Sequence, residues 1–160
     1  MLNNATAFRP LEDFSALPPR LAALRAWWNA KNGATDALPS RADFNPAEYR
    51  HLLPYIALVD ILRDPLGWRY RLVGTRMVEV MGGERTGRRM RELLSPPAVE
   101  GAAMLMTRLI ETRAPLAFTG TLYWLEKEYV GFHALVLPLS SNGEEIDMAL
   151  MGLDFGAPEA

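Results

Sequence analysis

The stretch that decides the fold is WRYRLVGTRMVEVMGGERTGRRMRELL, residues 68–94. It opens with an alternating pattern in which Trp68, Tyr70 and Leu72 are separated by single arginines. This period of two residues predicts a β-strand with one buried face and one solvated face.

Helical spacing replaces the alternation immediately after this strand. Met77, Val80 and Met81 lie three and four positions apart, so we expect a short helix that Thr75 caps and the following glycine pair ends. Residues 90–94 should form one more helical turn. A strand followed by such short helices makes a poor packed layer, but it is typical of the wall of a pocket.

The composition is that of an ordinary globular protein. The 160 residues are 49% apolar and 22% charged with a net charge of −2, which predicts one domain without a general attraction to nucleic acid. Because the chain has no cysteine, disulfides, thiolate metal sites and a cysteinyl flavin adduct are excluded. The N-terminus has no secretory signal pattern, and no apolar run reaches the roughly 18 residues of a membrane span, so we expect a cytoplasmic protein.

Two longer helices are predicted outside the opening stretch. The first runs from about Pro18 to Lys31 and carries an apolar seam at coiled-coil spacing, formed by Leu17, Leu21, Leu24 and Trp28. The second covers about 97–113, and its predicted buried face consists of Val99, Ala102, Ala103, Met106 and Ile110. Met104 and Leu105 lie off that face and are candidates for a partner surface.

Four further strands complete the pattern. They are predicted at residues 55–62, 115–125, 128–139 and 145–155. The connections at 64–67, 126–127 and 140–143 are short, so the strands that they join should pair as hairpins. The prediction is an α+β fold. A five-stranded antiparallel sheet carries the short helices and one long helix on one face, and an N-terminal amphipathic helix is added.

Strand 128–139 is apolar on both sides, so both faces of the sheet need cover. One side carries His133, Leu135 and Leu137, and the other carries Val130, Phe132, Ala134 and Val136. We expect the connecting helices to cover the first side. The N-terminal helix, from this subunit or from a partner, should cover the second. We divide the chain into residues 1–33, an arm and amphipathic helix, and residues 34–160, the main domain.

The order of elements from about Leu38 to Phe155 resembles a PAS domain, and in particular a compact bacterial PAS family found as short stand-alone chains. The resembling segments are LPSRADFNPAEYRHLLPYIALVDI, YRLVGTRMVEVMGG, ERTGRRMRELL and LVLPLSSNGEEIDMALMGLDF. The resemblance implies five strands in the order 2-1-5-4-3 around a small pocket. PAS domains are sensory or dimerisation modules, and many bind a small ligand or another protein. Haem-binding members usually carry a histidine on the long helix; helix 97–113 has none, so haem is not expected.

We expect the pocket between the inner strand faces and the helical wall, with candidate ligand-binding residues Tyr70, Met77, Met81, Met106, Trp124 and His133. His133 has two interpretations, a pocket donor or a hydrogen-bonded core or interface histidine, and we favour the second. The arginines from Arg85 to Arg91 could hold an anion or be ordinary exposed arginines, and we favour exposure. No catalytic set and no metal site is predicted.

The predicted function is a non-enzymatic PAS sensory or regulatory module in bacterial signalling, which binds a small molecule, a separate signalling protein, or both. One alternative is a pure interaction or dimerisation module without a ligand. Another is a small α+β enzyme that uses His133 with a nearby carboxylate, but the sequence offers no partner at a diagnostic spacing. No nucleic-acid partner is expected.

A homodimer is predicted from the N-terminal helix, because a helix of this length must pack on something. The candidate interface residues are Leu17, Leu21, Leu24, Trp27 and Trp28. Two surfaces compete for this seam, the outer face of the helix's own sheet and the same helix of a second subunit. A two-fold arrangement would let the helix contact both. The alternative is a monomer whose helix folds back on its own sheet.

Overall fold

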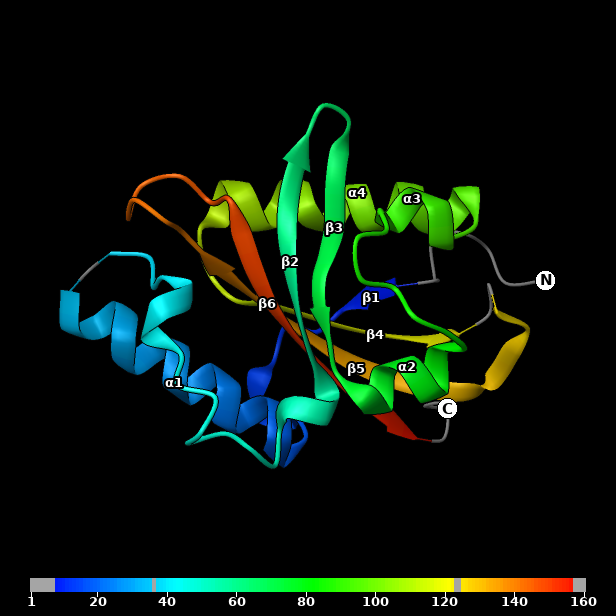
Figure 1. Ribbon diagram of the computed structural model, residues 1–160, viewed down its shortest axis with the longest axis horizontal. Helices are drawn as coiled ribbons and strands as arrows, with labels where there is room; N and C mark the ends of the chain where they lie inside the picture. Colours follow the sequence, from blue (N-terminus) through cyan, green and yellow to red (C-terminus); the bar gives the residue numbers. More distant parts are fainter. Residues whose placement is uncertain (1–7, 36, 123–124, 157–160) are drawn as a thin grey trace.

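The protein is built on one antiparallel sheet of six strands, as a computed structural model describes it for residues 8–35, 37–122 and 125–156 (Figure 1). The strand order across the sheet is β1-β4-β5-β6-β2-β3. The strands are β1 (Phe8–Pro10), β2 (Ile56–Arg63), β3 (Leu66–Val73), β4 (Leu116–Leu122), β5 (Lys127–Leu139) and β6 (Met148–Gly156). The α+β architecture is therefore confirmed.

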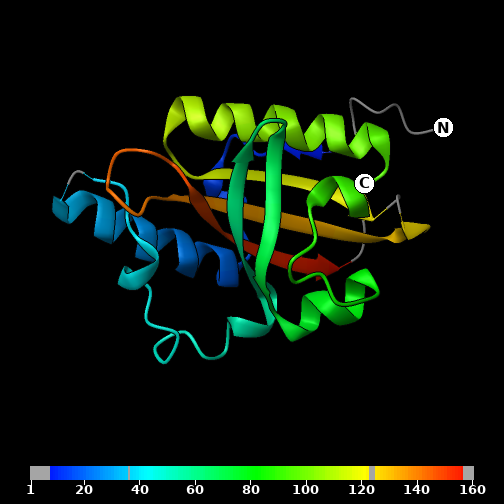
Figure 2. The same ribbon diagram turned by 45° about the horizontal axis from the view of Figure 1, so that its top comes forward.

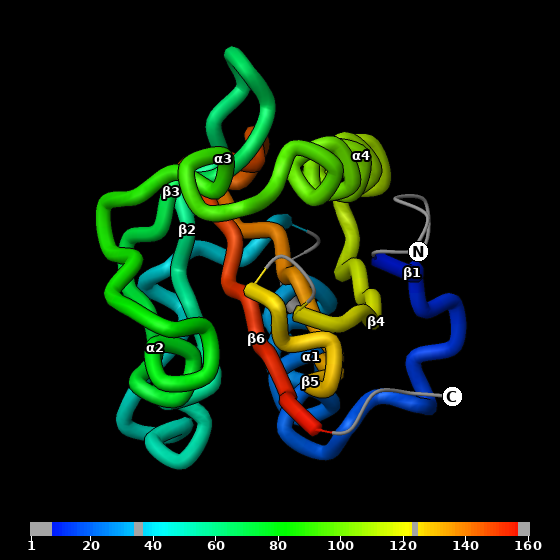
Figure 3. The backbone as a smooth tube through the Cα atoms, turned by 90° about the vertical axis from the view of Figure 1, so that its right-hand side faces the viewer, coloured from blue at the N-terminus to red at the C-terminus, as the bar shows by residue number. Residues whose placement is uncertain are grey.

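Helices lie on both sides of the sheet, as Figures 2 and 3 show. The helices are α1 (Pro19–Thr35), α2 (Thr75–Met81), α3 (Met90–Leu93) and α4 (Pro96–Thr112), with short 3-10 turns at 14–16, 41–43 and 53–55. We call the side of the sheet that carries α4 the inner face and the side that carries α1 the outer face. Among the described residues, no helix combines the length and apolarity that crossing a membrane requires.

The predicted number of five strands is wrong by one. β2, β3, β4, β5 and β6 have the order that the PAS resemblance implies, but β1 adds a sixth strand beside β4, with Phe8 opposite Gly120 and Pro10 opposite Phe118. Three residues are too few to show a period of two, so the sequence pattern gave no sign of this strand. Proline suits an edge strand because the ladder on one side needs no N–H from it.

Helix α1 packs on the sheet of its own chain. The seam residues Leu17, Leu21, Leu24, Trp27 and Trp28 are each at most 8% exposed within one chain. Gly152 of β6 has no side chain, and the space above it is filled by the ends of Leu21 and Leu24. The indole N–H of Trp28 donates to the carbonyl oxygen of Pro138 at 2.8 Å. The seam therefore packs on the sheet of its own chain, which is one of the two surfaces predicted for it, and the dimer interface stays a prediction. The predicted boundary at residue 33 stays a prediction, and one hydrophobic core joins both parts.

The predicted faces of β5 are interchanged. Phe132, Ala134 and Val136 point to the inner face, where they share a cavity wall with α4. Leu135 pairs with Gly152, so Leu135 and His133 belong to the outer face with α1. Alternation showed correctly that both faces are buried, but both sides of this strand are apolar and their composition does not tell which helix covers which.

A β-bulge in β3 changes the direction of the Leu72 side chain. Val59 pairs with Tyr70 and Leu58 pairs with Leu72, so Arg71 is the extra residue in β3. The bulge moves Leu72 off the inner face that Tyr70 occupies, and Leu72 is 54% exposed. The prediction that Leu72 is buried beside Trp68 is therefore wrong.

Helix α2 begins one residue earlier than a Thr75 cap would allow. The N-cap is Gly74, and Thr75 is already helical. A Cβ at residue 74 would lie 2.4 Å from the carbonyl oxygens of both Leu53 and Pro54, so only glycine fits there. The predicted stop is confirmed, because Gly82 adopts φ 84° in the left-handed region. The expected helical turn near 90–94 is α3.

Helix α4 buries a stripe that is rotated relative to the prediction. Its buried residues are Ala98, Ala102, Leu105, Met106 and Leu109. The assignment of Leu105 to a partner surface is wrong, since it is 6% exposed and faces the core. Met104 is 73% exposed, as expected for a residue off the buried face.

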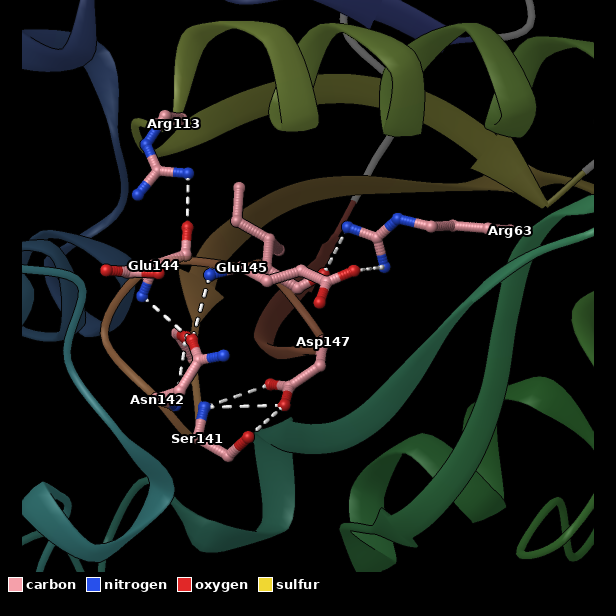
Figure 4. A network of polar contacts seen from close by, with 9 residues as sticks. Arg63, Arg113, Ser141, Asn142, Glu144, Glu145 and Asp147 are labelled. Carbon is pink, nitrogen blue, oxygen red and sulfur yellow. Dashed lines mark hydrogen bonds and ion pairs between the residues drawn. The ribbon is translucent and has the colours of Figure 1, made fainter.

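The loop between β5 and β6 is held by a polar network (Figure 4). The side-chain oxygen of Asn142 accepts from the backbone N–H of Glu144 at 2.9 Å, which confirms the predicted turn over 140–143. The guanidinium of Arg113, just after α4, donates to the carbonyl oxygen of Glu144. Arg63, at the end of β2, donates to the carbonyl oxygen of Ile146 at 2.6 Å. This end of the sheet is thereby tied to both the long helix and the β2–β3 hairpin.

Candidate functional site

A small apolar cavity of about 50 Å³ lies between the inner face of the sheet and α4. Its wall combines residues from β3, β4, β5, β6, α2 and α4 with Phe8 of the edge strand β1. The lining residues are Phe8, Trp68, Tyr70, Met81, Leu94, Ala102, Leu105, Met106, Phe118, Phe132, Ala134, Val136, Met151 and Leu153. The pocket wall predicted from the short helices therefore has a counterpart in the fold, although the cavity is smaller than the roughly 300–1,000 Å³ of a drug-sized site.

The structure brings three of the six predicted pocket residues together, since Tyr70, Met81 and Met106 all line the cavity. Met77 is fully buried but is not part of the cavity wall. His133 is half-buried on the outer face, opposite Thr119 of β4 and Asp154 of β6. Trp124 lies outside the described residues.

Trp68 is a cavity residue that the sequence reasoning missed. It precedes Tyr70 by two positions on the same strand face, and this spacing was the signal that could have found it. The two rings meet edge to face, with centroids 6.3 Å apart and planes at 90°. The buried indole Nε1–H of Trp68 has no acceptor within hydrogen-bonding geometry.

Arg85 is buried beside this part of the wall. It is 4% exposed, although exposed arginine was the favoured interpretation of the whole basic run, so for this residue that interpretation is wrong. Its Nη2 donates to the carbonyl oxygen of Met81 at 2.7 Å, while Nε and Nη1 are buried without partners. Burial lowers the pKa of Arg85 from its ordinary value, and the neighbouring Tyr70 opposes that shift.

Tyr70 connects the cavity to Arg85. Burial raises the pKa of its phenol, an effect that Trp68 and the positive charge of Arg85 partly offset. The phenol is therefore neutral at physiological pH and able both to donate and to accept a hydrogen bond.

The loop that carries Arg85 is shaped by Glu84. Its carboxylate accepts from the backbone N–H of Arg85 at 3.0 Å and from the hydroxyl of Thr86 at 2.7 Å. The hydrogen bonds from Thr86 and Arg85 lower the pKa of Glu84. Because Glu84 is used to hold the loop, it is turned to the backbone and is not a hydrogen-bond partner of the Arg85 guanidinium.

The remaining arginines of the run lie nearer the surface. Arg88 forms an ion pair with Glu92 at 2.7 Å, and Arg88 is the largest cause of the lowered pKa of Glu92. Arg89 and Arg91 line a surface pocket of about 240 Å³ near the β2–β3 turn. Trp68 belongs both to this pocket and to the inner cavity, so its side chain separates the two.

Two larger grooves open on the surface. One, of about 450 Å³, lies on the outer face beside Leu58 and Leu72, with Arg41 and Arg50 among its lining residues. The other, also of about 450 Å³, runs between β1 and α4, and Met104 is among its lining residues. In the described part of the chain, no group of three or more His, Cys, Asp or Glu side chains could hold a metal ion.

Comparison with known protein families gives a match to the PAS domain over residues 17–153, which includes α1, the four strands from β2 to β5 and most of β6. No curated protein matches the chain significantly. PAS domains are in general sensory modules without enzymatic activity, and they often mediate protein interactions. The match spans most of the 160 residues, and this chain belongs to the PAS domain family.

Proposed function

We propose that this protein is a sensory PAS module that binds a small molecule in its inner cavity and communicates the bound state to a signalling partner. The observation that carries the proposal is the cavity itself, which lies between the sheet and the helices that would transmit a change. Ala102, Leu105 and Met106 of α4 form part of the wall, so an occupant would contact the longest helix on that face. The thioethers of Met81 and Met106 adapt their shape more readily than branched side chains, which suits a wall that closes on a ligand.

Native mass spectrometry on protein purified from its own host tests the ligand. An additional mass that disappears on denaturation is expected for the wild type. Ala102→Met should abolish it, because Ala102 lines the cavity and the longer side chain fills it. The matched control is Ala103→Met on the same helix, where residue 103 is half-buried and outside the cavity wall. Retention of the additional mass in the Ala102→Met variant, or its absence from the wild type, contradicts the proposal.

A second candidate function, pairing with another protein chain, is favoured by the groove between β1 and α4. Met104 lines this groove and is 73% exposed, so it offers an apolar side chain that a second chain could cover. We propose that a homodimer of this protein uses this groove, since the α1 seam is covered by the sheet of its own chain. Light scattering on the wild type and on Met104→Glu tests it. A dimer that becomes monomeric in the variant supports the groove, whereas a wild-type monomer at tens of micromolar refutes the dimer.

The proposed function is non-enzymatic. His133, the residue considered for catalysis, lies on the outer face in register with Asp154, and Asp154 is paired with Arg20 at 3.4 Å. His133 is not among the lining residues of the cavity or of the three surface pockets described above. An intact His133→Ala variant that has lost a turnover measurable in the wild type would overturn this part of the proposal.

A further inference from the structure

We propose that Arg85 holds the carboxylate of a short-chain carboxylic acid whose apolar part occupies the inner cavity. The inference rests on the proposed sensory function and adds the chemical class of the ligand. It starts from an unbalanced charge. Arg85 is a buried cation beside the cavity wall, and no described residue forms an ion pair with it.

The unused hydrogen-bond donors of Arg85 are the first observation. Arg85 as a whole residue is 4% exposed. Only Nη2 has an acceptor, the carbonyl oxygen of Met81, and a carbonyl carries no net charge. Buried charges in proteins are normally paired, and buried donors normally have acceptors, so two unpaired nitrogens on one buried guanidinium indicate a missing partner.

The geometry of the guanidinium favours a carboxylate as that partner. Nη2 belongs to both forks of the group, one shared with Nε and the other with Nη1, and Met81 uses only one of the two Nη2 hydrogens. One complete fork of two parallel N–H donors therefore remains for the two oxygens of a carboxylate. A neutral amide would present only one acceptor to this fork and would leave the charge uncompensated.

The same residues connect Arg85 to the apolar cavity. Met81 accepts its hydrogen bond and lines the cavity, and Tyr70, which interacts with Arg85 electrostatically, lines it too. The unpaired indole N–H of Trp68 lies on the same wall. An acid bound at Arg85 would thus find further donors at its head and only apolar side chains around its tail.

Cavity size limits the tail. A volume of about 50 Å³ corresponds to about four water-sized groups, when one water needs roughly 10–15 Å³ on this measure. The apolar tail of a short acid, a chain of a few carbons, matches this volume. Long acyl chains do not fit.

The surface around the site favours the approach of an anion. The loop segment 84–92 carries four arginines and two glutamates, a local charge of +2 in a chain whose net charge is −2. Arg89 and Arg91 line the surface pocket that shares Trp68 with the cavity wall. A positive field at this point raises the local concentration of anions and repels cations.

Thermal unfolding with added sodium butyrate tests the inference, with butyramide as the neutral isostere and sodium chloride at matched ionic strength. For the wild type we expect butyrate alone to raise the midpoint, by about 5–10 °C at roughly hundredfold excess over the dissociation constant. Arg85→Met should lose this shift. Without ligand it should unfold at the same temperature as the wild type or higher, because it replaces an unpaired buried charge by an apolar chain of similar length.

Two further variants make the result decisive. Arg76→Met, which removes an exposed arginine of α2 that pairs with Glu79, should retain the whole butyrate shift. Arg85→Lys keeps the charge without the planar fork and should retain less than half of it, which decides the question if Arg85→Met does not fold. An equal shift with butyramide or chloride, no shift in the wild type, or an undiminished shift in a folded Arg85 variant overturns the inference.

This outcome is separable from that of the proposed function. If butyrate fails but native mass spectrometry finds a neutral ligand that Ala102→Met expels, the sensor remains and the carboxylate is wrong. If no ligand of any kind is found, both fail together.

Discussion

Replacing Leu24 by alanine probes the packing of α1 on its own sheet. Leu24 is 1% exposed, and its Cδ1 would lie 2.7 Å from a Cβ built on Gly152. The substitution removes three buried carbons above a residue that has no side chain to fill the space. We therefore expect a loss of about 3–4 kcal/mol in the free energy of unfolding, within the range measured for buried Leu→Ala changes. For a chain of this length the midpoint of thermal unfolding should fall by about 10 °C.

Urea unfolding followed by circular dichroism, at two protein concentrations tenfold apart, measures this effect. Ala26→Gly is the control, because residue 26 is exposed on α1 and the change should cost only the helix propensity, about 1 kcal/mol. If α1 packs within its own chain, the loss for Leu24→Ala is the same at both concentrations. A loss no larger than that of the control, or one that depends on concentration, would refute intramolecular packing.

Three further predictions follow from individual contacts. Gly74→Ala should lower the free energy of unfolding by about 2 kcal/mol or more in chemical unfolding, because the new Cβ would clash with the carbonyl oxygens of Leu53 and Pro54. Alanine also restricts the unfolded chain, but this stabilises the protein by less than about 1 kcal/mol and does not offset the clash. A variant as stable as the wild type would mean that this approach is loose. Tyr70 has a raised pKa in the folded protein, so its contribution to stability is complete below its ordinary pKa of 10.0 and is lost as the pH rises through the folded value. The free energy of unfolding of Tyr70→Phe should accordingly fall less than that of the wild type between about pH 9 and pH 11, and parallel curves would contradict the burial of this phenol. His133→Ala should cost about 1–3 kcal/mol through lost packing and an unpaired partner group, without affecting any turnover, and unchanged stability would show that the histidine is not part of the outer-face packing.

Sequence patterns predicted the elements of this fold better than their environments. Strand-type runs bounded by turn signals indicated every strand from β2 to β6, and glycine and proline marked the ends of α2 and α4. Leu72 shows the limit, since the bulge at Arg71 reverses its direction and depends on pairing with β2. The faces of β5 show a second limit. Both faces of this strand are apolar, so the sequence does not tell which helix packs on which face.

The residues of the candidate site were also predictable only in part, because a sequence pattern indicates the face on which a residue lies but not what packs against it. Tyr70, Met81 and Met106 follow from strand alternation and helical spacing, which place them on the pocket side. Arg85 does not, because arginine is exposed in most proteins and nothing local in GGERTG indicates burial. Its position depends on a loop that Glu84 folds back and on the distant wall of β3. His133 was assigned to the pocket through the interchange of the two sheet faces.

The central claim, that the inner cavity of this PAS domain holds a small molecule, is tested most directly by a crystal structure of protein purified from its own host. The account predicts electron density for a bound molecule between Tyr70, Met81 and Met106. The methionine side chains should be moved apart to a larger cavity than about 50 Å³. A solid core in the same place, with no void larger than one water molecule, would contradict the sensory function and leave this domain as an interaction module.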